Sequence, residues 1–167
     1  MNRESIVLLK NANEFLPLDK NKDQKILVTG PLATEIGYTI SRYGPSNNPS
    51  ISILEGLKQY NNGKLNIDFA KGCEVVNDGW PGTEIIDERI SEKEQQMVNE
   101  AVEKAKNSDV IIAVVGENEK IVGESLSRTS LNLPGRQLNL LKALHATGKP
   151  VIMILVNGRP LTINWEN

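Results

Sequence analysis

Four apolar runs stand out along the chain: KILVTG (25–30), LNIDFA (65–70), VIIAVVG (110–116) and PVIMILVNG (150–158). These runs are rich in β-branched residues and nearly continuous, rather than alternating between apolar and polar positions. Such continuity is typical of parallel strands that are covered on both faces of a sheet. The pattern therefore predicts four buried, parallel strands.

The segments between these runs carry helical patterns. NPSISILEGLKQYNNG offers Asn48 or Ser50 as a helix cap, and Ser91 with Glu94 fits a capping box at the start of SEKEQQMVNEAVEKAKNSD. In LPGRQLNLLKALHATGKP the predicted apolar face comprises Leu138, Leu141, Ala143 and Leu144. Strands that alternate with helices predict an α/β fold: a doubly wound, mostly parallel sheet with helices on both faces, an α/β sandwich. A sheet of this kind ordinarily continues beyond a fourth strand. Either this sheet is small, or the chain ends inside a larger domain and the fold is truncated at the C-terminal end.

Long irregular segments occupy 31–48, 71–90 and 117–133. Loops of this length in a compact domain are usually functional or mobile. Segments 31–48 and 117–133 leave the carboxyl ends of predicted strands, which is the edge where open α/β sheets bind ligands. We therefore expect any site to lie at this edge.

Composition narrows the classes of function. Hydrophobic residues make up 39% and charged residues 24% of the 167 residues, which is ordinary for a globular domain, and the net charge of −2 gives no reason to expect nucleic acid or an anionic membrane as partner. No apolar run approaches the roughly 20 residues that span a bilayer. The single cysteine, Cys73, is expected to be a buried thiol, and the single histidine, His145, a structural residue near a helix end. We expect no metal site and no cofactor.

The segment AVVGENEKIVGESLSRTSLNL places Glu117, Glu119 and Glu124 after a buried strand, followed by Arg128. A carboxyl group can act as general acid or base when its surroundings hold its pKa near the working pH. Most loop glutamates are instead solvated surface charges. Arg128 has three possible roles, namely pairing with Glu124, binding a polar substrate or lying in solvent, and the residues alone leave all of these alternatives open.

A segment after the first strand and two aromatic residues do not indicate one particular ligand. The segment VTGPLATEIG follows the first strand but lacks the glycine spacing of both dinucleotide-binding and P-loop motifs, which weakens a Rossmann-like nucleotide site. Tyr43 and Trp80 are aromatic residues in irregular segments. Such rings stack on sugars, but they also fill gaps in a core.

In order along the chain, ESIVLLKNANEFLPLDKNKDQKILVTGP, YGPSNNPSISILEGLK, AKGCEVV, SDVIIAVVGENE, GESLSRTSLNLPGRQLNLLKAL and TGKPVIMILVNGRPLTINW resemble the C-terminal α/β sandwich domain of family 3 glycoside hydrolases, the β-glucosidase and β-xylosidase group. The resemblance covers essentially the whole chain. It implies that 1–24 is a linker and lead-in from a catalytic barrel outside this chain, and that 25–167 is the incomplete C-terminal domain. It also implies a parent enzyme that is periplasmic or secreted.

In this family the barrel carries an aspartate nucleophile and the second domain supplies the general acid/base. The resemblance implies that Glu124, immediately before SLSR, is that catalytic residue, that Glu117 supports the loop, and that Glu119 is a surface charge. It further implies substrate-binding roles for Tyr43 and Arg128, with Arg128 also ordering the loop. A glycoside or oligosaccharide substrate would be shared with the barrel, and the isolated chain is expected to be inactive. The alternative is a non-catalytic module that binds carbohydrate or packs between domains.

Overall fold

The computed structural model describes residues 5–40, 49–60 and 64–165. Its core is a four-stranded sheet in the order β2-β1-β3-β4, and every pair of neighbouring strands is parallel. The strands are β1 (Lys25–Thr29), β2 (Asn66–Ala70), β3 (Val110–Gly116) and β4 (Val151–Val156). All four predicted strands are confirmed, with bounds that differ by at most two residues. The predicted burial holds for β1 and β3 but not for β2 and β4, which are mostly half-buried because they lie at the edges of the sheet.

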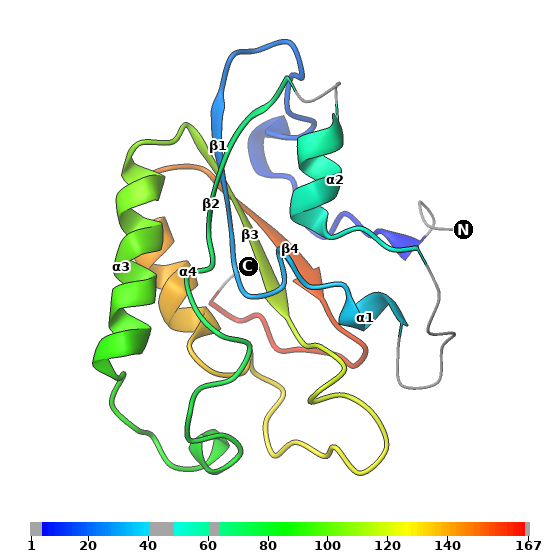
Figure 1. Ribbon diagram of the computed structural model, residues 1–167, viewed down its shortest axis with the longest axis vertical. Coiled ribbons are helices and arrows are strands. Elements are labelled where there is room, and N and C mark those ends of the chain that lie inside the picture. Colours follow the sequence, from blue (N-terminus) through cyan, green and yellow to red (C-terminus); the bar gives the residue numbers. More distant parts are fainter. Residues whose placement is uncertain (1–4, 41–48, 61–63, 166–167) are drawn as a thin grey trace.

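Helices cover both faces of this sheet (Figure 1). They are α1 (Gly37–Ile40), α2 (Ile53–Gln59), α3 (Glu92–Lys106) and α4 (Gln137–His145), with short 3-10 helices η2 (Ala12–Glu14) and η4 (Gly82–Glu84). One core cluster joins the sheet to α3 and α4, and a second joins its other face to α2. The doubly wound α/β fold predicted from the apolar runs is confirmed.

The ends of the helices test the predicted caps. The capping box is confirmed, since the Ser91 side chain accepts from the Glu94 N–H and the Glu94 carboxylate accepts from the Ser91 N–H. The cap predicted for α2 at Asn48 or Ser50 is wrong, because Ser52 occupies that position and its hydroxyl accepts from the Glu55 N–H. A serine two residues further on satisfies the same first-turn donor, so the helix begins later.

The apolar face of α4 also differs from the prediction. Leu140, Leu141 and Leu144 are buried together with the first residue of the helix, Gln137. Leu138 is only partly buried. Since α4 packs against both α3 and the sheet, its buried stripe is rotated relative to the predicted one.

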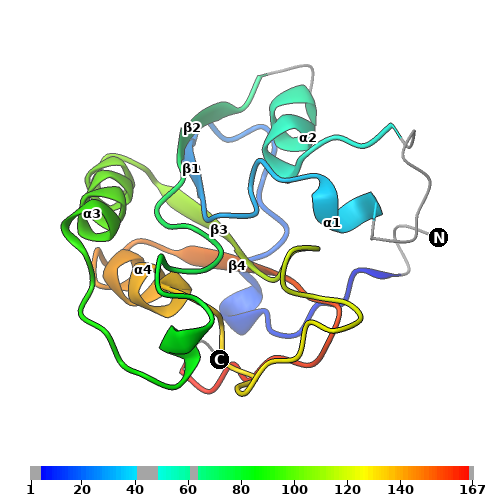
Figure 2. The same cartoon turned by 60° about the horizontal axis from the view of Figure 1, so that its bottom comes forward.

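Long loops gather at the carboxyl ends of the strands. Figure 2 shows segments 71–90 and 117–136 side by side below the sheet, at the end where β1 and β3 also finish. The connection from β1 leads to the face covered by α2, and the connection from β3 leads to α4 on the opposite face, so the switch point lies between these two strands. In the described ranges no helix is long and apolar enough to cross a membrane.

Candidate active site

The candidate site begins where β3 ends. Gly116 has a φ of 132°, and a Cβ at this position would overlap the carbonyl oxygen of Val156 on β4. The buried side chain of Gln137 accepts from the Gly116 N–H at 2.7 Å and donates to the Gly116 carbonyl at 2.9 Å and to the Val75 carbonyl at 3.0 Å. One amide thus binds both polar groups of the last strand residue and fixes the start of the following loop.

Glu117 is the first residue of that loop and its side chain is fully enclosed, with 0% exposed. Its Oε1 accepts from Nη1 of Arg128 at 2.8 Å and lies 3.2 Å from Nε of Arg159, an ion-pair distance without a hydrogen bond. Its Oε2 has no hydrogen-bond partner among the described residues. Glu117 is therefore unlike most loop glutamates, which are solvated, and two guanidinium groups compensate the burial of its charge.

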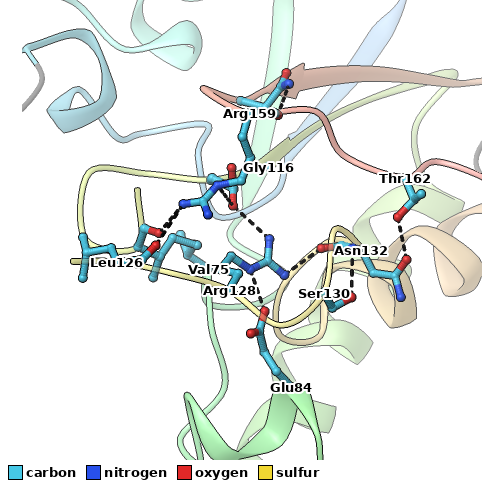
Figure 3. A network of polar contacts seen from close by, with 12 residues as sticks. Val75, Glu84, Gly116, Leu126, Arg128, Ser130, Asn132, Arg159 and Thr162 are labelled. Atoms are coloured by element: carbon cyan, nitrogen blue, oxygen red, sulfur yellow. Dashed lines mark hydrogen bonds and ion pairs between the residues drawn. The ribbon is translucent and has the colours of Figure 1, made fainter. Parts of the chain in front are cut away.

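Arg128 lies at the centre of a polar network that joins three segments (Figure 3). Its side chain is 2% exposed, and its Nε donates to Oε1 of Glu84 at 2.6 Å while its Nη1 donates to Glu117. Its Nη2 donates to the Asn132 carbonyl at 2.8 Å, and its guanidinium lies 5.6 Å from the ring centroid of Trp80. Each guanidinium nitrogen is thus engaged within the protein, which suits a residue that orders the loop; its predicted contact with substrate stays a prediction.

Glu84 is a member of this network that the sequence did not single out. Its Oε2 accepts from the N–H of Thr129 at 2.8 Å and from the Thr129 hydroxyl at 3.0 Å. Burial raises the pKa of the Glu84 carboxyl, but the hydrogen bonds from Thr129 and Arg128 outweigh it, so that its pKa lies below the ordinary value. Segment 71–90 contains several acidic residues, and no feature of the sequence distinguishes this one.

Glu124 lies on an exposed turn of the loop. The N–H of Leu126 donates to the Gly123 carbonyl at 3.1 Å, so Glu124 and Ser125 are the two central residues of a β-turn. Ser125 has a φ of 63°, a conformation that favours glycine. The turn belongs to the loop that leaves the carboxyl end of β3, which is the edge where the sequence predicts a site.

Arg159, in the segment after β4, is a second residue that sequence reasoning missed. Its Nη2 donates to the Ile121 carbonyl at 2.8 Å and to the Leu126 carbonyl at 3.3 Å, on either side of the turn. The motif NGRP offered a signal only in hindsight, since an arginine after a turn is ordinarily a solvated charge.

The remaining predicted positions give a mixed outcome. Glu119 is partly buried rather than a surface charge, and its carboxylate lies where a Cβ on Gly37 would be. Its Oε2 is enclosed without a hydrogen-bond partner among the described residues. Tyr43, the predicted sugar-stacking aromatic, lies outside the described residues.

The cysteine and the histidine lie away from this network. Cys73 is buried in the core, and burial raises the pKa of its thiol. His145 makes an edge-to-face contact with Trp165, with ring centroids 5.6 Å apart. Among residues 5–40, 49–60 and 64–165, no three His, Cys, Asp or Glu side chains gather into a metal-binding group.

The network separates acidic residues that look equivalent in the sequence. Glu84 and Glu117 are enclosed and paired with arginines, so they hold the loop in place. Glu124 is exposed, at the edge where open α/β sheets bind ligands. The structure therefore places Glu124 at an exposed position on a loop that buried ion pairs anchor.

Comparison with known proteins gives a family for this architecture. Residues 6–167 match the model of the glycosyl hydrolase family 3 C-terminal domain. The chain is 39% identical to a β-xylosidase of Formosa agariphila, over 97% of this chain and 21% of that protein. It is 38% identical to a periplasmic β-glucosidase of Salmonella typhimurium, over 99% of this chain and 22% of that protein. The chain thus spans about a fifth of the length of these relatives.

Solved structures give the same result. A β-glucosidase from Erythrobacter marinus superposes with a TM-score of 0.76 at 33% identity, covering 95% of this chain and 23% of that one. A family 3 exo-β-xylosidase in complex with a xylobiose aziridine probe superposes with a TM-score of 0.71 at 27% identity, covering 90% of this chain and 17% of that one.

Proposed function

The chain belongs to glycoside hydrolase family 3, as the C-terminal domain of its members, and from that premise we propose that it is the second domain of a retaining β-glycosidase. The enzyme would hydrolyse O-glycosidic bonds of β-glucosides or β-xylosides, together with a barrel domain outside this chain. The observation that carries the proposal is the exposed position of Glu124 on an anchored loop at the carboxyl edge of the sheet.

Retaining hydrolysis requires two carboxyl groups about 5–5.5 Å apart, one on each side of the scissile bond. In the proposed division of labour, an aspartate of the barrel attacks the anomeric carbon, and Glu124 protonates the leaving oxygen. Glu124 then takes a proton from the water that releases the sugar from the barrel aspartate. Glu117 is a weaker candidate, because its carboxylate is enclosed between two arginines and cannot approach a substrate.

The proposed substrate contacts follow the same division. A glycoside bound in the barrel would meet this domain at loop 117–133, with Tyr43 as the proposed stacking residue. Arg128 would act on the substrate through the loop, since its guanidinium is already fully engaged.

The proposal is tested by Glu124→Gln in the intact enzyme. Loss of general acid catalysis lowers rates by about 10²–10⁴-fold for substrates with poor leaving groups. Activated aryl glycosides need little protonation and should be affected far less in the glycosylation step. Azide should restore part of the activity, because it attacks the glycosyl-enzyme without a general base.

Glu119→Gln is the matched control, since Glu119 lies on the same loop five positions earlier and has no proposed catalytic role. It should show neither the leaving-group dependence nor the azide effect. Equal losses on both substrate classes in Glu124→Gln, without azide rescue, would remove Glu124 as the acid/base.

The isolated 167-residue chain should not turn over an aryl β-glucoside, because the nucleophile is proposed to lie in the barrel. Calorimetry with cello- and xylo-oligosaccharides on the same chain addresses the alternative function. A carbohydrate-binding module would be favoured if the chain binds these oligosaccharides without catalysis and Glu124→Gln leaves the activity of the intact enzyme unchanged.

A further inference from the structure

Residues 121–126, here called the arc, carry Glu124 near their middle. The two ends of the arc are joined by one side chain, because Nη2 of Arg159 donates to the carbonyls of both Ile121 and Leu126, at 2.8 and 3.3 Å. Figure 3 shows Arg159 reaching from the segment after β4 toward Leu126, on a side of the loop different from that held by Glu84. A residue outside the loop therefore holds the two ends of the arc together.

Arg159 also connects the arc to the end of β3. Its Nε lies 3.2 Å from Oε1 of Glu117, the residue that follows that strand. The backbone of Arg159 is itself held, since the side-chain amide of Asn157 donates to the Arg159 carbonyl at 2.7 Å. Next to it, a Cβ on Gly158 would lie 3.3 Å from a methyl group of Val122, so the segment after β4 packs closely on the arc.

The arc needs such a support because it contains little structure of its own. Residues 117–136 are all described and contain no helix or strand. Inside the arc, the turn places Ser125 at a φ of 63°, and a non-glycine residue in such a conformation costs on the order of 1–3 kcal/mol unless its surroundings enforce it. A donor that binds both ends of the arc is the kind of constraint that keeps this turn populated.

We propose that Arg159 is a positioning residue for the acid/base, which fixes the direction of the Glu124 carboxylate by clamping the carbonyls of Ile121 and Leu126. This inference rests on the proposed function. It is distinct from the role of Arg128, which binds Glu84, Glu117 and the Asn132 carbonyl and so anchors the loop beyond the arc.

The chemistry of arginine fits this role. A planar guanidinium presents donors in a fixed fork, so that one side chain binds two carbonyls and faces a carboxylate at the same time. A lysine keeps the charge opposite Glu117, but all its donors lie on one nitrogen at the end of a flexible stem, so it cannot hold both carbonyls and face Glu117 in one fixed geometry. Arg159→Lys therefore separates the clamp from the charge.

The expected effect follows from how strictly proton transfer depends on position. A displacement of about 1 Å in a reacting group can cost about 10²-fold in rate. We expect Arg159→Lys to lower kcat/KM for poor leaving groups by about 10–100-fold, with a much smaller loss for activated aryl glycosides. The loss should fall on kcat more than on KM, because the arc is proposed to orient the acid rather than bind the sugar.

Arg136→Lys is the matched control. Arg136 also pairs with a glutamate, Glu94, at 3.3 Å and donates to a backbone carbonyl, that of Glu88, at 2.8 Å, but it lies outside the arc. A purely structural loss would lower the activity on all substrates equally. A positioning role predicts a loss that depends on the leaving group, and it predicts this for Arg159→Lys alone.

A second measurement does not depend on catalysis. In the 167-residue chain, Arg159→Lys and Arg159→Gln should speed amide hydrogen exchange within residues 121–126 by about tenfold or more while leaving the amides of β1 and β3 protected. Arg136→Lys should leave the arc as protected as in the unmodified chain. Unchanged exchange in the arc of both Arg159 variants would overturn the inference, whatever their activity.

The double variant Arg159→Lys/Glu124→Gln separates the two proposals. If Arg159 acts through Glu124, its substitution should add almost nothing to the loss already caused by Glu124→Gln. A Glu124→Gln variant without leaving-group dependence refutes the proposed function. The positioning role alone is refuted if Glu124→Gln shows that dependence while Arg159→Lys lowers the activity on all substrates equally.

Discussion

Replacing Arg128 by methionine would remove the cation at the centre of the buried network while keeping much of the apolar length of the side chain. Two carboxylates, Glu84 and Glu117, would then face the position of the lost guanidinium, with side chains only 6% and 0% exposed. Removing one partner of a buried ion pair leaves an uncompensated buried charge, which typically costs about 3–5 kcal/mol.

The surviving contacts limit this cost. Glu84 would keep both hydrogen bonds from Thr129, and Glu117 would keep Arg159 at 3.2 Å. The three hydrogen bonds lost with Arg128 involve a charged donor, and such bonds contribute about 1.5–3 kcal/mol each before compensation. We therefore expect Arg128→Met to lower the free energy of unfolding by about 3 kcal/mol or more.

Urea unfolding at neutral pH, followed by circular dichroism and extrapolated linearly to water, measures this change. Lys106→Met is the matched control, because Lys106 pairs with Glu103 on the surface with side chains 56% and 67% exposed. Its loss should stay within about 0.5 kcal/mol. A loss below about 1 kcal/mol in Arg128→Met, with an unchanged m-value, would refute the view that the buried network holds the loop to the domain.

Two further predictions concern pH and backbone conformation. Folding lowers the pKa of Glu84, so its ionised form stabilises the protein above the ordinary pKa of 4.5, and this stabilisation is lost as the pH falls through the folded-state pKa. In acid unfolding, Glu84→Gln should therefore lose stability less steeply below pH 4.5 than the unmodified chain. An identical slope would contradict this prediction. Gly116→Ala, with its Cβ directed into the Val156 carbonyl, should lower the free energy of unfolding by about 2 kcal/mol or more, whereas Gly82→Ala, with no atom within 4 Å, should stay within about 0.5 kcal/mol in the same urea assay.

The sheet was predictable because its signal is local. Runs such as VIIAVVG are continuous and β-branched, and every residue of β3 is indeed buried. The capping box of Ser91 and Glu94 was equally readable, since its two members lie within one helical turn. The start of α2 was not, because Asn48, Ser50 and Ser52 all carry side chains that can cap a helix, and the local sequence does not distinguish the one that does, Ser52.

The polar network was beyond local reasoning. Glu84 and Arg128 are 44 positions apart, and Arg159 lies 38 positions beyond Ile121. The spacing of residues along a helix or strand predicts neither contact, because irregular loops bring these residues together. The sequence did predict that Glu117 and Arg128 act on the loop, yet it gave no sign that Glu117 would be fully enclosed or that Glu84 and Arg159 would complete the arrangement.

The hydrogen bonds between Gln137 and Gly116 bring together the two ends of the segment that carries Glu124. These hydrogen bonds hold the two ends of the loop together, so the entropic cost of closing the loop depends only on the length of the chain between them. Doubling the length of a closed loop costs only about 0.6 kcal/mol more. Lengthening or shortening the exposed part of the stretch between these two residues should therefore change the free energy of unfolding little, as long as Glu117 and Arg128 keep their buried contacts.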